Sequence, residues 1–451
     1  MSATVSPAGR IIALDVLRGI AILGTLASNV WIFSTPGGPA EWFSDGFAMA
    51  DPIQRVLQAL ANGKFLGLLT LLFGVGLELQ YRSMVRRGMP WPGRYALRAS
   101  ILFVEGLVHY ILVFEFDVLM GYAIASVLAA YLIGRSDRVV RAWGGVIAAI
   151  YVTAILGLTA LLVAMPDVSA GAGGAAAGAS GAGAAADVST ASWLDQVLLR
   201  ITHMEVFRIE LLLIVPSATV LFLVGSRLVR AGMFSMTEDG ARLRRRLAWV
   251  GLGAGVPLNA LTTWAGQDWF LVDRYLVPPL VALGILALGT TLVDRAQRRA
   301  QARAQVEAQA LERAQTQQLA QTQQLAQTQQ LAQTQQQTQQ EGQEQEGQEQ
   351  EQVRALSPLP SPGRRLAGLL HRGVEGVGRT ALSCYVLQNV LASAICYDWG
   401  LGLAGGSPWQ VVAIWAVIST MLMVAAPLWL RRWSRGPIEL LMHRVYDTRR
   451  R

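Results

Sequence analysis

The chain alternates long apolar runs with short polar segments that are rich in arginine. About ten of the runs are long enough to cross the roughly 30 Å of bilayer hydrocarbon as a helix. They occupy approximately residues 14–33, 56–80, 99–116, 118–134, 143–165, 206–229, 247–264, 270–293, 379–397 and 409–430. Pro278 and Pro279 in the eighth run predict a kink, because proline removes a helical hydrogen bond. The pattern predicts an all-α fold, a polytopic transmembrane helical bundle of about ten helices.

The polar segments predict the direction of each span. Arginine-rich segments follow the second, fourth, sixth, eighth and tenth runs, whereas the segment after the first run carries Glu41, Asp45 and Asp51. Short cytoplasmic loops carry the excess of Lys and Arg in membrane proteins. The alternation therefore predicts that both termini are cytoplasmic.

Two segments between the runs lack the apolar residues that a core needs. Residues 166–205 begin with an Ala/Gly-rich stretch, which predicts a flexible external linker. Residues 294–377 contain a six-residue Leu-Ala-Gln-Thr-Gln-Gln repeat, which predicts a partly helical or disordered cytoplasmic insert. These segments divide the helices into three groups. Five lie in residues 1–165, three in residues 206–293, and two, followed by a basic tail, in residues 378–451.

Composition supports a membrane protein and excludes several other classes. Hydrophobic residues make up 53% of the chain and charged residues only 15%, and the mean hydropathy is +0.37. We therefore expect the lipid bilayer to be the main partner. The net charge of +8 resides in loops between apolar runs, so it does not indicate binding to nucleic acid. The two cysteines share one apolar run and the four histidines are scattered, so no metal site is predicted.

The third apolar run contains the strongest candidate for catalysis. His109 follows Glu105 by four residues, which places both side chains on one face of a helix. An imidazole titrates near neutral pH, and a neighbouring carboxylate would orient it as a general base. The alternative is that His109 is a packed polar residue that hydrogen-bonds a neighbouring helix.

Other polar residues inside the apolar runs are candidates for substrate binding. Asp15 and Arg18 share one helix face, where they form either a binding pair or an interfacial anchor. Lys64 would hold a phosphate or carboxylate, or else extend towards the membrane surface. Tyr385 and Gln388 would hydrogen-bond either a polar substrate or an adjacent helix.

Several motifs resemble the YeiB-like family, which comprises bacterial membrane proteins described as domain of unknown function 418. The motifs are Leu-Asp-Val-Leu-Arg-Gly at 14–19, Leu-Leu-Phe-Gly-Val-Gly at 71–76, Gly-Leu-Val-His at 106–109 ahead of Asp-Val-Leu at 117–119, Gly-Arg-Thr-Ala-Leu-Ser-Cys-Tyr-Val-Leu-Gln at 378–388, and Arg-Gly-Pro-Ile-Glu at 435–439. Ser383 and Cys384 stand where the family usually has Thr-Asn, and the Gln-rich repeat lies outside the family pattern.

The resemblance implies a relation to the wider transmembrane acyltransferase group, whose enzymes move acyl units from a cytoplasmic donor such as acetyl-CoA to sugars across the membrane. It implies a multi-pass protein of the bacterial inner or plasma membrane. We therefore hypothesise acyl-CoA as a co-substrate, an envelope glycan or lipid as the acceptor, and no bound cofactor. In this hypothesis His109 and Glu105 are catalytic, and Asp117 joins the substrate-binding residues. Arg18, oriented by Asp15, binds the donor's phosphates at the cytoplasmic mouth near the depth of Glu105, whereas His109 lies deeper and meets the acceptor hydroxyl.

A second hypothesis comes from a different class of protein. Ionisable residues within membrane spans also form permeation or proton paths. The same residues would then belong to a carrier for a lipid or metabolite, without acyl-transfer chemistry.

Overall fold

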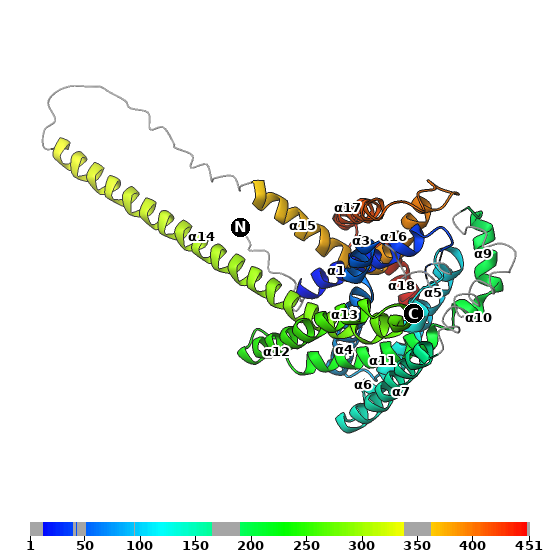
Figure 1. Cartoon of the computed structure of the whole chain (residues 1–451). Coiled ribbons are helices and arrows are strands. Elements are labelled where there is room, and N and C mark those ends of the chain that lie inside the picture. Colours follow the sequence, from blue (N-terminus) through cyan, green and yellow to red (C-terminus); the bar gives the residue numbers. More distant parts are fainter. Residues whose placement is uncertain are drawn as a thin grey trace. The chain divides into compact units, whose positions relative to one another are not determined.

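The computed structural model describes residues 12–38, 42, 51–93, 95–164, 190–337 and 362–448. The chain divides into two compact units, one formed by residues 1–291 with 368–451 and the other by residues 292–367. Within the described ranges the regular elements are all helical (Figure 1). The predicted all-α polytopic bundle is therefore confirmed for the larger unit.

Most residues of the predicted apolar runs are helical, but the run 56–80 is divided between two helices and the run 99–116 ends in a turn. Among the described residues, seven helical stretches are long and apolar enough to cross a membrane, and α6 and α16 are shorter apolar helices. The elements are α1 Ile12–Ser34, α3 Pro52–Ala61, α4 Lys64–Arg86, α5 Tyr95–Leu112, α6 Leu119–Ile133, α7 Asp137–Ala164, α9 Trp193–Thr202, α10 Met204–Phe207, α11 Leu211–Arg230, α12 Glu238–Ala248, η1 Trp249–Ala254, α13 Gly255–Trp264, η2 Gln267–Trp269, η3 Val272–Leu276, α14 Pro278–Gln337, α15 Pro362–Arg379, α16 Ala381–Cys396, α17 Pro408–Arg432 and α18 Pro437–Thr448.

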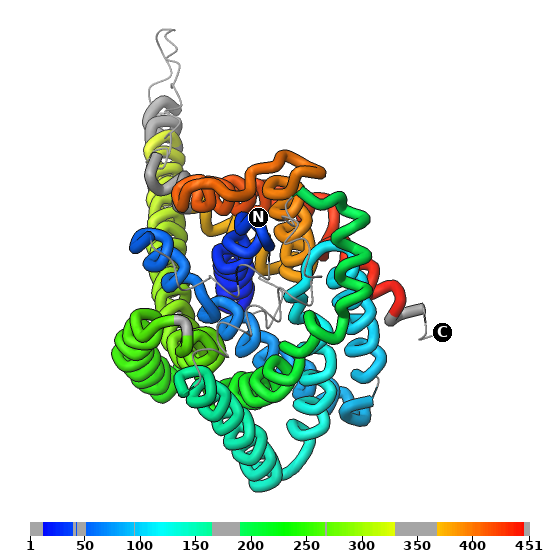
Figure 2. The backbone as a smooth tube through the Cα atoms, turned by 45° about the vertical axis from the view of Figure 1, so that its right-hand side comes forward, coloured from blue at the N-terminus to red at the C-terminus, as the bar shows by residue number. Residues whose placement is uncertain are grey.

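Helix α1 lies among the other helices of the larger unit, in contact with α3, α4, α16 and α17 (Figure 2). The close crossing of α4 and α11 depends on two glycines. A Cβ atom on Gly74 would lie 2.3 Å from the carbonyl oxygen of Phe222, and one on Gly225 would lie 2.3 Å from that of Leu71. Membrane helices approach each other closely where small residues meet, because lipid provides no hydrophobic force that drives helices together.

The helical backbone is interrupted at two places, and each place contributes a residue to the wall of one cavity. Between α3 and α4, Gly63 has a positive φ of 67°, and a Cβ there would lie 2.4 Å from the carbonyl oxygen of Arg274. The other break is the π-helical turn η3, directly before α14 begins at Pro278. The predicted kink takes the form of a helix start at Pro278, where proline is tolerated because its missing N–H is not needed.

The predicted linker at 166–205 is wrong in its described part. Residues 165–189 lie outside the described residues, but α9 and α10 occupy most of the segment that follows. Ser192 caps α9 by accepting a hydrogen bond from the backbone N–H of Asp195. Helix α9 then packs against α5. The Ala/Gly-rich composition therefore ends before this short helix.

In the smaller unit, helix α14 continues through the glutamine-rich repeat as far as Gln337. All described side chains from 298 to 329 are exposed. Deleting residues 315–350 is therefore expected to shift the midpoint of thermal unfolding by less than about 2 °C. The measurement is fluorescence-detected unfolding of both proteins in the same detergent. A larger loss of stability would show that the repeat contributes to the folded bundle.

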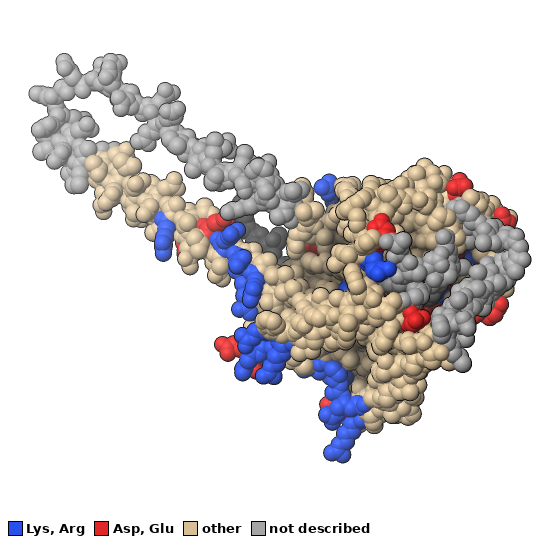
Figure 3. All heavy atoms as spheres, in the orientation of Figure 1, with Lys and Arg blue, Asp and Glu red and all other residues tan. Residues whose placement is uncertain are grey.

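The orientation in the membrane remains a prediction. On the visible face, basic side chains gather over α12 and at the base of α7 (Figure 3). Cysteines introduced at Thr202 and Gln318, which are both exposed, are expected to react with an impermeant reagent from opposite sides of the membrane. Labelling of intact cells and of inverted vesicles measures this. Reaction of both cysteines from one side would contradict the arrangement with both termini cytoplasmic.

Candidate functional site

A buried imidazole–carboxylate pair joins the end of α5 to the turn before α6. His109 Nδ1 lies 2.7 Å from Asp117 Oδ2, and both side chains are almost fully buried. The other oxygen of Asp117, Oδ1, accepts hydrogen bonds from the backbone N–H groups of Leu119 and Met120 at 2.9 and 3.3 Å. Asp117 thus caps α6 while it holds the ring, so the carboxylate is fixed relative to the backbone.

The predicted pairing of His109 with Glu105 is wrong. Glu105 is one turn earlier on α5, but neither of its carboxylate oxygens has a hydrogen-bond partner among the described residues. The short turn at residues 113–118 folds the chain back and brings Asp117 to the ring. Helical spacing alone identified a neighbour of His109, but the turn supplied its partner.

Two asparagines complete the surroundings of the imidazole. Asn389 Nδ2 lies 3.3 Å from His109 Nε2, and Asn29 Nδ2 donates to Asn389 Oδ1 at 3.3 Å. Because the Asp117 carboxylate accepts from Nδ1–H, the lone pair of Nε2 accepts from the Asn389 amide. Asn29 was absent from the sequence candidates. The feature of the sequence that could have identified Asn29 is a polar amide within the apolar first run.

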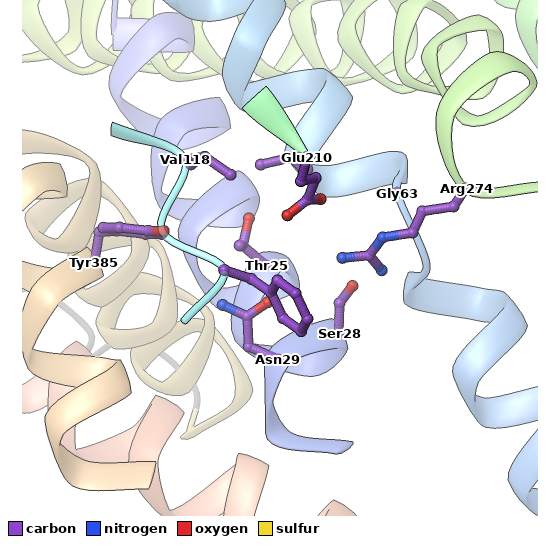
Figure 4. A pocket seen from close by; sticks show the side chains of 10 residues that line it. Thr25, Ser28, Asn29, Gly63, Val118, Glu210, Arg274 and Tyr385 are labelled. Carbon is purple, nitrogen blue, oxygen red and sulfur yellow. The ribbon is translucent and has the colours of Figure 1, made fainter. Parts of the chain in front are cut away.

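A small cavity lies beside this group of residues (Figure 4). Its volume of about 20 Å³ has room for about one water molecule. Its wall combines the polar residues Thr25, Ser28, Asn29, Glu210, Arg274 and Tyr385 with Gly63 and apolar side chains. Asn29 also belongs to the His109 network, and the Tyr385 ring centroid lies 5.5 Å from that of His109. Asn29 and Tyr385 therefore connect the cavity wall to the surroundings of the His109 imidazole.

The cavity offers both hydrogen-bond donors and acceptors. Thr25 and Ser28 donate to the carbonyl oxygens of Ala21 and Ala61, so their hydroxyl oxygens retain lone pairs. Glu210 Oε1 accepts from the Tyr275 hydroxyl at 2.5 Å, whereas Oε2 has no partner among the described residues. The Arg274 guanidinium points into the cavity (Figure 4).

The π-helical turn η3 fixes Arg274 in this position. Asp273, its neighbour, is buried and accepts hydrogen bonds from four side chains, which are those of Asn62, Asn259, Thr262 and Thr263. Asn62 Oδ1 accepts from Arg274 Nη1 at 2.9 Å, and the guanidinium lies over the ring of Trp42. The sequence did not single out Arg274, because an arginine near a predicted span boundary is typical of a solvated loop end.

The Asp15–Arg18 pair forms, with Arg18 Nη1 3.4 Å from Asp15 Oδ1. It lies far from His109, however, because α1 reaches the imidazole network through Asn29. At 1.5 Å per residue, Arg18 is about 16 Å from Asn29 along the helix axis. Arg18 and His109 therefore do not touch, and the predicted site, with Arg18 at its mouth and His109 deeper, stays a prediction.

The remaining candidates differ in their surroundings. Lys64 is buried at the start of α4, next to Gly63 of the cavity wall, and its Nζ donates to the carbonyl oxygen of Ala59. Tyr385 lines the cavity. Gln388 is fully buried, and neither its amide oxygen nor its amide nitrogen has a partner among the described residues.

Comparisons with known proteins give a family match and similar curated proteins. Residues 362–449 match the family described as "Protein of unknown function (DUF418)". The chain is 32% identical over 122 residues to "Uncharacterized protein YxaH" of Bacillus subtilis, which covers 26% of this chain and 30% of the relative. It is 30% identical over 134 residues to "Uncharacterized protein YeiB" of Escherichia coli, which covers 29% of this chain and 33% of the relative.

The matches thus span about a third of the length of these curated relatives. No solved structure gives a significant match. The apolar helices define a multi-pass membrane protein. The C-terminal part of the chain is thus similar to the DUF418 family, and part of the chain is similar to the two uncharacterised relatives.

Proposed function

We propose that this protein is a transmembrane acyltransferase, which moves an acyl group from a cytoplasmic acyl-CoA to a hydroxyl group of an envelope glycan or lipid. The observation that carries the proposal is the buried His109–Asp117 pair beside a small polar cavity. An imidazole oriented by a carboxylate is an effective general base for a hydroxyl group.

In the proposed reaction, His109 Nε2 takes the proton of the acceptor hydroxyl while the hydroxyl oxygen attacks the thioester carbonyl carbon. Asp117 keeps the proton on Nδ1 and stabilises the imidazolium that forms. The carbon–sulfur bond then breaks, and the leaving thiolate takes the proton from Nε2. The acceptor hydroxyl must displace the Asn389 amide from Nε2, and Asn29 remains as a hydrogen-bond partner for that amide.

The chemistry of the cavity supports an alcohol as the acceptor. A hydroxyl group both donates and accepts hydrogen bonds, which suits a wall containing Arg274 and the free oxygen of Glu210. An anionic group would be repelled by Glu210, and a cationic group by Arg274. A volume of about 20 Å³ leaves no room for both charged groups of a zwitterion.

The distance between the two polar ends of α1 agrees with transfer across a membrane. Arg18 would bind the phosphates of the donor at one end, and the cavity near Asn29 would receive the acceptor at the other. The roughly 16 Å between them would be bridged by the extended part of the donor.

The test uses protein reconstituted in liposomes with labelled acetyl-CoA on the side of Arg18 and extracted envelope glycans and lipids on the other. We expect a covalently acylated product from the wild-type protein.

A carrier is the second candidate function, favoured by the buried, unpartnered polar atoms of Glu105 and Gln388, which suit a proton path. Movement of unmodified substrate across the membrane, without an acylated product, would favour the carrier and contradict the transferase.

A further inference from the structure

Helix α9 has its polar residues inside and its apolar residues outside. Gln196 and Arg200 are each 1% exposed, whereas Leu194, Leu198 and Ile201 are 58%, 50% and 51% exposed. A helix that faces water shows the opposite pattern, with its apolar stripe against the protein. The inverted pattern indicates that the outer face of α9 does not face water.

The buried face of α9 is fixed to the end of α5. Arg200 Nε donates to Glu115 Oε1 at 2.8 Å, and Arg200 Nη1 donates to the carbonyl oxygen of Ile111 at 3.2 Å. The Tyr110 hydroxyl donates to the carbonyl oxygen of Arg200 at 2.6 Å. Because these bonds hold the polar face inward, rotation of α9 cannot hide its aliphatic side chains without exposing buried polar groups.

The aliphatic face of α9 continues onto neighbouring apolar surface. The indole N–H of Trp193 donates to the carbonyl oxygen of Leu112, an exposed residue at the end of α5. On the other side, Ile209 and Leu212 are strongly exposed where α10 leads into α11. Since α5 and α11 belong to helices that are apolar and long enough to span a membrane, this surface is continuous with one that lipid covers.

We propose that α9 is an interfacial helix, and that Leu194, Leu198 and Ile201 contact the acyl chains of the leaflet at the α5–α6 end of the bundle. Trp193 would lie at the headgroup level, where tryptophan is enriched. The exposed charged residues beside the face are Asp195 and Glu205, so anionic headgroups are not attracted to it. Burial of aliphatic surface therefore provides the interaction, and zwitterionic lipid suffices.

The same segment supports the residues around His109. Arg208, just after α10, donates from Nη1 to the carbonyl oxygen of Asp117 at 3.0 Å and from Nη2 to that of Glu115. Its guanidinium lies 4.1 Å from the ring centroid of Tyr110. The leaflet that holds α9 would thus also stabilise the turn that carries Asp117. This inference concerns lipid contact and is independent of the proposed acyl transfer.

The test places a nitroxide spin label at Leu198→Cys and, as a matched control, at Asp195→Cys, which lies on the exposed polar edge of the same helix. The full-length protein is reconstituted in nanodiscs of phosphatidylcholine, and relaxation by oxygen is compared with relaxation by a water-soluble nickel chelate. Cys384 and Cys396 are buried, and the unsubstituted chain measures their background labelling. A Leu194→Cys label serves as a second position on the aliphatic face.

We expect oxygen to relax the labels at positions 198 and 194 at least about threefold more effectively, relative to nickel, than the label at position 195. Adding anionic lipid should leave these ratios unchanged. Equal nickel access at all three positions would overturn the proposal, because α9 would then face water. Protection of position 198 from both oxygen and nickel would also overturn it, because protein, such as a second copy of the chain, would then cover the face.

Discussion

The His109→Gln protein is expected to lose between about 10² and 10⁴ in acyl-transfer rate while it remains folded. Glutamine has a similar size and offers an amide to Asp117 and Asn389, but it cannot accept a proton at neutral pH. The measurement is the initial rate of acylated product formation in the reconstituted system. Retained helicity and an unchanged elution profile in detergent would show that the fold survives.

Glu105→Gln provides the matched control on the same helix. Because the Glu105 carboxylate has no hydrogen bond to His109, its neutralisation is expected to change the rate by less than about tenfold. Equal losses in the two variants would show that Glu105, and not only Asp117, supports the imidazole during the reaction. Full activity of His109→Gln would remove His109 from the mechanism.

The Arg200→Met protein is expected to lose about 3–5 kcal/mol of stability, because the substitution leaves the Glu115 carboxylate buried without its partner. The side chains of Arg200 and Glu115 are only 1% and 2% exposed, so water cannot replace the lost interaction. Unfolding in a mixed detergent and denaturant series, followed by tryptophan fluorescence, measures the change.

The double variant Arg200→Met with Glu115→Gln separates charge from packing. It removes both charges and is expected to be more stable than Arg200→Met alone. Arg242→Met is the control for loss of an exposed arginine, since the side chain of Arg242 is 62% exposed in its pair with Asp239. Its effect should stay below about 1 kcal/mol. If Arg200→Met were no more harmful than Arg242→Met, the buried pair would not stabilise this end of the bundle.

The two expected effects depend on one short region between α5 and α6. Asp117 holds His109 and caps α6, whereas Glu115 pairs with Arg200 of α9. Arg208 also donates to the backbone of both acidic residues. The His109→Gln variant therefore removes the partner of Asp117, and the Arg200→Met variant removes the partner of the neighbouring Glu115.

The sequence by itself determined the helical bundle, because an apolar run of sufficient length has only one common way to satisfy its backbone in lipid. It also located the interruption at Pro278, since proline restricts its own backbone wherever it occurs. It identified His109 and Tyr385, because polar groups are conspicuous in apolar surroundings. These inferences use only local composition and spacing.

Only the tertiary structure decided which side chains meet. The turn selected Asp117 in place of Glu105 as the partner of His109. The position of α1 brought Asn29 to the imidazole network, whereas Arg18 is about 16 Å from Asn29 along the helix axis. The π-helical turn at η3 directed Arg274 into the cavity, although its sequence resembled a loop end. Helix α9 appeared where composition predicted a linker. Helical periodicity fixes which residues share a face of one helix, whereas turns and helix crossings determine which faces are in contact.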